Sequence, residues 1–243
     1  MYGKNINDLN TKKKIKLINL NFVKLYKICS EKEFSYLKIL LPKDKQFTIK
    51  EKNFYFYIHN GLINLNGKNY SFDSKRTFFT KSNLTFNTIT NTAIFLFFQK
   101  KKETVKIEKK KFDTKNKFYI VRNSFIREKY WGQIITLFSN NKGACKIIFM
   151  KNGSQSSMEF HIRKKENYYI NYRKIDLGIR YGSAKQKIIK LTKNCSFLML
   201  PGTMHMRIAK LDTQIIEMST KDRDDDSIIV HDGKKFKFIE TRE

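Results

Sequence analysis

Four side chains in the second half of the chain have the types and the spacing of a metal site. Glu159, His161 and Glu166 lie close together in the stretch "MEFHIRKKE", and His205 follows in "LPGTMHMR". Imidazole and carboxylate groups are ligands for Mn²⁺, Fe²⁺ and Zn²⁺, and they also transfer protons. Polar residues on a solvated strand are the alternative. The predicted strands and turns around these residues are needed to distinguish a metal site from a solvated strand.

Strand patterns dominate the whole chain. The stretch 53–72 predicts three strands joined by turns at Asn60-Gly61 and Asn66-Gly67, because Asn-Gly pairs are strong hairpin signals. A helical turn is expected near 31–40. Further short strands are expected at 91–99, 145–153, 167–174, 186–194, 196–202 and 213–220. Many short strands at this spacing are typical of a β-sandwich or barrel, so the predicted fold class is all-β.

The two halves of the chain also resemble each other. Laying Tyr57 on Tyr169, an offset of 112 (169 − 57), aligns "FYFYIHNGLINLNGKNYSF" with "NYYINYRKIDLGIRYGSAKQKI". A polar, lysine-rich stretch at 99–117 separates the halves as a linker or exposed edge. We therefore expect two domains of similar fold, 1–112 and 113–243.

The four candidate ligands stand in the order of the two cupin motifs. Five residues separate Gly153 from Glu159, His161 follows two positions later, and four residues lead on to Glu166. The stretch that ends at His205 resembles the second motif, P-x-G-x-x-H. The chain thus resembles the cupin superfamily, which implies two antiparallel jelly-roll barrels. It also implies that Glu159, His161, Glu166 and His205 bind one divalent metal (Mn, Fe or Zn) inside the second barrel.

A narrower resemblance covers the run from about Lys129 to Gly233. "KYWG" (129–132), "MLPGTMH" (199–205) and "EMSTKDRDDDSIIVHDG" (217–233) occur in the order and spacing of the cupin domain of type II mannose-6-phosphate isomerase, which is often fused to mannose-1-phosphate guanylyltransferase. This resemblance implies an enzyme of carbohydrate metabolism, namely a metal-dependent isomerase of a sugar or sugar phosphate.

The isomerase resemblance also assigns roles to residues. Such a reaction needs a cation to polarise a carbonyl and a base to move a proton. Glu159 or Glu166 would be the base. Arg173, Arg180 and Arg207 would hold the phosphate through paired hydrogen bonds.

Several positions depart from the cupin pattern and leave other functions open. Glu159 replaces the first ligand histidine, and Arg173 and Asn194 stand where the family has glycines. A cupin without metal or activity that binds a sugar or another metabolite is one alternative. Another metal cupin enzyme, a dioxygenase or a lyase, is the second. The acidic run at 222–226 is interpreted as a solvated turn.

The first half has no metal ligands at the corresponding positions. An offset of 112 places Phe47, Ile49 and Phe54 at the first motif, and an offset of 119 (197 − 78) places Phe86 at the second. All four residues are apolar. The first half is therefore predicted to be a structural or dimer-forming barrel without metal.

Composition limits the partners and the compartment. The net charge of +28 (50 basic minus 22 acidic residues) comes with lysines spread through every segment and with abundant Asn, Ile, Phe and Tyr, the residues of AT-rich codons. No zinc-finger, RNA-recognition or basic-helix signature accompanies it, so a nucleic-acid partner is disfavoured. The three cysteines form no C-x-x-C pair, the N-terminal stretch lacks a signal-peptide core, and apolar runs are too short to span a bilayer. We expect a cytoplasmic protein with a small-molecule partner, a homodimer being one option.

Overall fold

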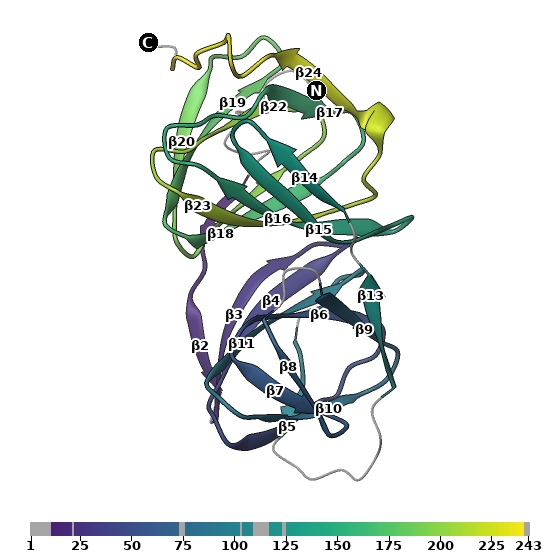
Figure 1. Ribbon diagram of the computed structural model, residues 1–243. Coiled ribbons are helices and arrows are strands. Elements are labelled where there is room, and N and C mark those ends of the chain that lie inside the picture. Colours follow the sequence, from purple (N-terminus) through teal and green to yellow (C-terminus); the bar gives the residue numbers. More distant parts are fainter. Residues whose placement is uncertain are drawn as a thin grey trace. The chain divides into compact units, whose positions relative to one another are not determined.

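The computed structural model describes residues 11–20, 22–72, 76–102, 104–108, 117–122 and 125–240, and within them almost every element is a strand (Figure 1). The all-β prediction is confirmed. The helical turn expected near 31–40 is wrong, because β4 (Ser35–Leu41) occupies this stretch. Leu37, Ile39 and Leu41 alternate into the core and the strand pairs on both edges, which outweighs its helix-like composition. No helix in the described residues is long and apolar enough to cross a lipid bilayer.

The described chain forms two compact units, which we call the first and the second barrel. The first barrel comprises Lys16–Ser124, and the second comprises Phe125 onwards together with the N-terminal segment up to Ile15. Two strand pairings explain why these limits differ from the expected 1–112 and 113–243. The strand β1 (Thr11–Lys14) pairs with β21 (Cys195–Met199), and β13 (Phe118–Arg122) pairs with β9 (Arg76–Thr80).

The first barrel consists of a seven-stranded and a five-stranded antiparallel sheet. The larger has the order β13-β9-β6-β11-β4-β3-β2, with β6 at Phe54–Asn60, β11 at Thr92–Phe98, β3 at Val23–Ser30 and β2 at Leu17–Leu20. The smaller has the order β12-β5-β10-β7-β8, at Ile107–Glu108, Lys45–Ile49, Leu84–Thr88, Leu62–Leu65 and Lys68–Ser71. The strand β12 lies inside the stretch predicted to be a linker or an exposed edge, and it forms one edge of this sheet.

One of the two predicted Asn-Gly hairpin turns forms in the first barrel. At the other, Asn60-Gly61, the chain turns from β6 into β7, but these strands lie in different sheets and form no hairpin. The turn between β7 and β8 consists of Asn66 and Gly67, with φ angles of 52° and 82°. Two consecutive positive φ angles are what a type I′ hairpin turn requires, and asparagine and glycine adopt them at the lowest cost. The predicted strand–turn–strand–turn–strand order of 53–72 is confirmed.

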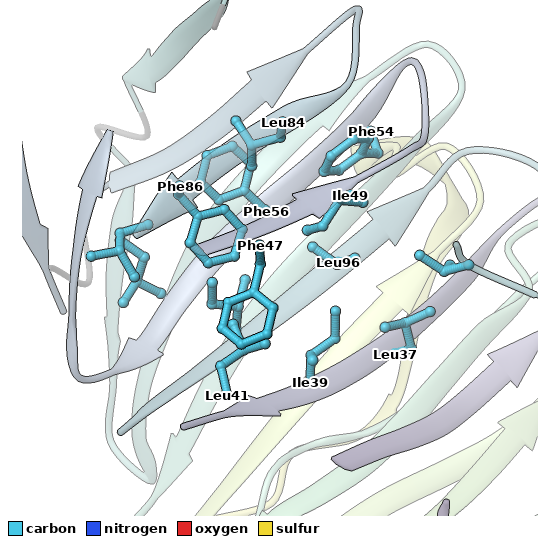
Figure 2. Packing of buried hydrophobic residues seen from close by; sticks show 14 of the residues in the cluster. Leu37, Ile39, Leu41, Phe47, Ile49, Phe54, Phe56, Leu84, Phe86 and Leu96 are labelled. Carbon is cyan, nitrogen blue, oxygen red and sulfur yellow. The ribbon is translucent and has the colours of Figure 1, made fainter. Parts of the chain in front are cut away.

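Phenylalanine rings and aliphatic side chains fill the interior of the first barrel. Figure 2 shows Phe47, Ile49, Phe54 and Phe86 among the buried side chains of this core. Each of the four is at most 2 % exposed, and the ring centroids of Phe47 and Phe86 are 6.1 Å apart. The positions aligned with the candidate ligands therefore point into the barrel and carry only hydrocarbon.

The second barrel has the same two-sheet design. Its seven-stranded sheet has the order β1-β21-β18-β23-β16-β15-β14, with β18 at Glu166–Tyr172, β23 at Thr213–Ser219, β16 at Gly143–Met150, β15 at Gly132–Asn140 and β14 at Ile126–Lys129. Its five-stranded sheet has the order β20-β19-β22-β17-β24, at Lys187–Thr192, Lys174–Tyr181, Thr203–Ile208, Met158–His161 and Ser227–His231. A short 3₁₀ helix, Asp224–Asp226, precedes β24.

Candidate metal centre

Three strands of the second barrel bring the four candidate ligands together. Glu159 and His161 are alternate residues of β17, so both are on the same side of that strand. His205 on β22 stands directly opposite Glu159 in the strand register. Glu166 begins β18, in the facing sheet. His161, Glu166 and His205 are almost fully buried, whereas the Glu159 side chain is 19 % exposed.

The ligand atoms face one point. Glu166 Oε1 lies 3.1 Å from His205 Nε2 and 3.7 Å from His161 Nε2. Glu159 Oε1 lies 3.8 Å from His205 Nε2. Glu159, His161 and His205 each offer one ligand atom within 4.8 Å of the others. Atoms about 2.1 Å from a shared ion are about 3.0–3.4 Å apart. The more widely separated of these side-chain atoms, up to 4.8 Å apart, must therefore approach one another by up to about 1.4 Å for the set to bind one ion.

Backbone carbonyls orient both imidazoles. His161 Nδ1 lies 3.1 Å from the carbonyl oxygen of Asp226, and His205 Nδ1 lies 3.1 Å from that of Thr203. A carbonyl only accepts, so each Nδ1 donates its hydrogen. When the rings are neutral, each Nε2 then has a free lone pair that faces the centre. Metal-binding histidines have the same outer hydrogen bond.

A buried arginine holds Glu159. An Arg207 guanidinium nitrogen donates to Glu159 Oε1 at 2.7 Å, and Ser227 Oγ donates to Glu159 Oε2 at 3.0 Å. The guanidinium lies over the rings of Trp131 and Tyr168, at 5.3 and 5.6 Å from their centroids. Burial would raise the pKa of Glu159, but the charges of Arg207 and His205 lower it to about 2. Glu159 is therefore ionised at neutral pH.

The pKa values of His161 and His205 are shifted in opposite directions. Burial lowers the pKa of His161, which the charge of Glu166 offsets only in part. Burial would also lower the pKa of His205, but the charge and the hydrogen bond of Glu166 raise it above 6.5. The pKa of Glu166 is well below its usual range, since Lys164 and both histidines overcome the effect of burial. In the absence of a metal, the centre thus favours a proton on His205.

Only Arg207 of the three predicted phosphate-binding arginines lies at the centre. Leu177 and Ile179 of β19 point into the barrel core, so Arg180 points to the opposite face of that strand. Its Nε donates to the Gly182 carbonyl. Arg173 is exposed in the turn between β18 and β19 and lies over the Tyr172 ring.

Arg173 and Asn194, which stand where the cupin pattern has glycines, both adopt a backbone conformation that glycine favours. Arg173 has a φ of 58° and Asn194 a φ of 64°. Both angles lie in the left-handed region that glycine favours. The turns are therefore of the kind that a glycine would make, although neither residue is a glycine.

Asp226, which the sequence pattern did not indicate, holds the loop between β17 and β18. Its carboxylate accepts hydrogen bonds from the backbone N–H groups of Arg163 and Lys164 at 2.9 and 2.8 Å, and its carbonyl orients His161. Asp226 is 1 % exposed. The interpretation of the acidic run as a solvated turn is wrong for this residue. Its exposed acidic neighbours in the sequence conceal its burial.

A group of buried charges, also not indicated by the sequence pattern, lies beside Glu166. Lys146 and Lys164 are each 5 % exposed, and Glu217 is 3 % exposed. Lys164 Nζ lies 2.9 Å from Glu166 Oε2. Lysines are so frequent in this chain that neither of these two stands out, and their carboxylate partners come from other strands.

No protein-family model and no curated protein matches the sequence. Solved structures do match. The Lactobacillus farciminis oxalate decarboxylase formate complex aligns with a TM-score of 0.69 and 8 % identity over 94 % of this chain and 90 % of that one. A Bacillus subtilis oxalate decarboxylase with Mn(II) centres aligns with a TM-score of 0.67 and 9 % identity over 94 % and 81 %. At this identity the likeness concerns the fold, and the chain has the double-barrel cupin fold of the oxalate decarboxylases.

Proposed function

We propose that the second barrel binds one divalent metal ion through Glu159, His161, Glu166 and His205, and that the protein is a metal-dependent cupin enzyme acting on a small anionic substrate. The observation that carries this proposal is that Glu159, His161 and His205 each offer one ligand atom within 4.8 Å of the others. Glu166 Oε1 lies 3.7 and 3.1 Å from the two imidazole Nε2 atoms, and both Nδ1 atoms are bound to carbonyls. A nitrogen and oxygen ligand set suits Mn²⁺, Fe²⁺ or Zn²⁺.

The chain's own residues indicate where a substrate would bind. Glu159, 19 % exposed, has more access to solvent than the other three ligands, so a substrate would approach from its side. Arg207 lies beside it and stays charged when buried, since burial lowers its pKa less than the neighbouring Tyr168 and Glu159 raise it. A guanidinium is suited to binding the paired oxygens of a carboxylate or phosphate.

The metal, when bound, would polarise a carbonyl or stabilise an oxyanion that develops in the substrate. Arg207 would orient the anionic group, and the rings of Trp131 and Tyr168 would keep water away from the guanidinium. Glu159 and Glu166 both have strongly lowered pKa values, which makes them weak bases at neutral pH. Their role is therefore to hold charge, and a metal-bound or substrate group would carry the proton.

The site is compatible with two classes of anionic substrate, a small carboxylic acid and a hexose phosphate. The small carboxylic acid is the better supported. One arginine at the centre fits a single carboxylate, whereas a phosphate clamp of Arg173, Arg180 and Arg207 would need all three. Proteins of the same fold act on oxalate. Isomerisation of a hexose phosphate is the second candidate. It is supported by the contact of Arg207 with Trp131, which belongs to the "KYWG" stretch of the isomerase resemblance.

The test compares wild type with His205→Ala and with His231→Ala. The second variant is a matched control, because the His231 ring stacks on Phe236 instead of facing the four ligands. We expect about one equivalent of Mn²⁺, Fe²⁺ or Zn²⁺ in wild type and in His231→Ala, measured by elemental analysis after purification without a chelating tag. His205→Ala should lose the metal and the activity.

Activity is measured in two assays, decarboxylation of small dicarboxylates and aldose–ketose exchange of hexose phosphates. Turnover in one assay assigns the substrate class. If wild type binds no metal when metal is supplied in excess, the enzyme proposal fails, and a metal-free metabolite-binding cupin replaces it.

A further inference from the structure

Four charged side chains of the second barrel form a closed ring of alternating sign. Lys146 Nζ lies 2.6 Å from Asp222 Oδ2, and Lys164 Nζ lies 3.4 Å from Asp222 Oδ1. Glu217 Oε1 closes the ring, at 3.4 Å from Lys146 and 3.6 Å from Lys164. Lys146 and Glu217 are direct neighbours across β16 and β23. Two cations and two anions make the ring neutral.

The fold alone does not require this ring. The side chains of Lys146, Lys164 and Glu217 are 4–6 % exposed, and taking charges out of water costs more free energy than a typical ion pair returns. The first barrel of this chain fills the same kind of interior with phenylalanine and aliphatic side chains. The ring therefore calls for an explanation other than stability.

The connection between the ring and the metal centre is Lys164. Its Nζ lies 2.9 Å from Glu166 Oε2. The other oxygen, Oε1, faces His205 Nε2 at 3.1 Å and accepts a hydrogen bond from the Tyr168 hydroxyl at 3.2 Å. The two oxygens of this carboxylate thus have separate partners, one a cation and the other the ligand cluster.

We infer that Lys164 is a positioning residue that binds one oxygen of Glu166 and leaves the other for the metal ion, and that Glu217 and Asp222 hold Lys164 in place. This inference rests on the proposed function, since it concerns how one proposed ligand is presented. Without Lys164, the Glu166 carboxylate is free to turn and to offer both oxygens to the ion. The ligand geometry should then change, and so should the affinity for metal.

Co²⁺ is the probe, because its visible absorption depends on the number and arrangement of its ligands. The spectrum and the Co²⁺ affinity are measured for wild type, Lys164→Met and Lys146→Met. Lys164→Met should shift the absorption bands and weaken Co²⁺ binding by about 10-fold or more, as expected when an outer partner of a ligand is lost. Lys146→Met removes the same charge from the same ring but leaves the contact between Lys164 and Glu166. It should lower the melting temperature and retain the wild-type spectrum.

The possible results separate this inference from the proposed function. Wild-type protein that binds no Co²⁺ overturns both. Wild-type protein that binds Co²⁺, with an unchanged spectrum and affinity in Lys164→Met, overturns the inference alone and makes Lys164 a residue of the fold. If Lys164→Met does not fold, Lys164→Gln replaces it, because its amide keeps a polar group in the ring of charges while its shorter, uncharged side chain loses the ion pair with Glu166. An unchanged Co²⁺ spectrum in that variant overturns the inference as well.

Discussion

The two barrels of this chain pair the aligned strand positions in the same register but have side chains of different chemistry there. Phe47 stands opposite Phe86 in the first barrel, as Glu159 stands opposite His205 in the second. Phe54 pairs with Thr80, and the corresponding pair in the second barrel is Glu166 with Met199. The same two offsets, 112 and 119, relate both pairs.

The same fold can therefore bury either apolar side chains or charged side chains at these positions, provided that every buried charge has a partner of opposite charge. In the first barrel, the interior positions aligned with the candidate ligands contribute stability through apolar burial. In the second barrel, each buried charge named above has a partner of opposite charge within 4 Å, for example Glu159 with Arg207 and Glu166 with Lys164. A substitution that places an unpaired charge among apolar side chains, or strands a buried charge, should therefore lower the free energy of unfolding more than an apolar-to-apolar substitution.

The largest effect is expected for Phe47→Glu, which places the residue type of Glu159 in the first barrel. Phe47 packs against the rings of Phe22 and Phe86, at 5.8 and 6.1 Å between centroids. A carboxylate among these rings lacks what Arg207 supplies to Glu159. We expect a loss of about 4 kcal/mol or more in the free energy of unfolding.

Phe47→Leu is the control for Phe47→Glu, because it removes the ring without adding charge. Its expected cost is about 1–2 kcal/mol. Urea denaturation measures both variants. Equal losses would mean that the interior of the first barrel tolerates charge, and the contrast between the barrels would then fail.

The next effect concerns the ring of charges. Glu217→Leu leaves Lys146 and Lys164 with fewer partners and should cost about 3 kcal/mol, because breaking a buried ion pair strands a charge. The double variant Lys146→Met/Glu217→Leu replaces the pair by apolar side chains, as in the first barrel. It should unfold within about 1 kcal/mol of wild type. A double variant that loses the sum of its single effects would contradict this reasoning.

A pH-dependent effect of similar or smaller size is expected for His59. This residue lies within β6, half-buried against the rings of Phe72 and Phe95. Burial, together with the charge of Lys38, lowers its pKa from 6.5 to about 4. The unfolded chain therefore binds a proton below pH 6.5 that the folded chain accepts only near pH 4, so stability falls as the pH falls through this window.

Each pKa unit corresponds to about 1.36 kcal/mol, so the His59 contribution is at most about 3 kcal/mol. The measurement is the free energy of unfolding of wild type and His59→Phe between pH 4 and 7. The difference between the two curves isolates His59 from the carboxyl groups. Parallel curves would show that its pKa is not lowered in the folded protein.

The smallest effect is expected for Tyr168→Phe, which gives the second barrel the residue found at the equivalent position of the first, Phe56 (168 − 112). The hydroxyl bonds Glu166 Oε1 at 3.2 Å and His205 Nε2 at 3.3 Å. Its loss opens no large cavity and should cost about 1 kcal/mol. Tyr172→Phe, on the exposed end of β18, serves as the control and should be close to neutral. Thermal unfolding of both variants makes the comparison.

The sequence by itself determined the fold class and the set of candidate ligands. Strand alternation is a local property with a period of two residues, so residue types two apart reveal which side chains share a face. Glu159 and His161 are such a pair, and Asn66-Gly67 specifies the hairpin of β7 and β8 in the first barrel. The repeat offset placed Phe47 and Phe86 in register with Glu159 and His205 without any structure.

The tertiary structure alone decided which charges are buried. Arg180 points away from the core and Arg207 into it, and the sequence around them does not distinguish the two. Asp226, Lys146 and Lys164 occur among exposed residues of the same types, so composition predicts a solvated surface for all three. Burial of a charge depends on partners that are distant in the chain, such as Asp226 at 62 positions from Lys164. Folding brings such partners together, and local sequence patterns carry no record of them.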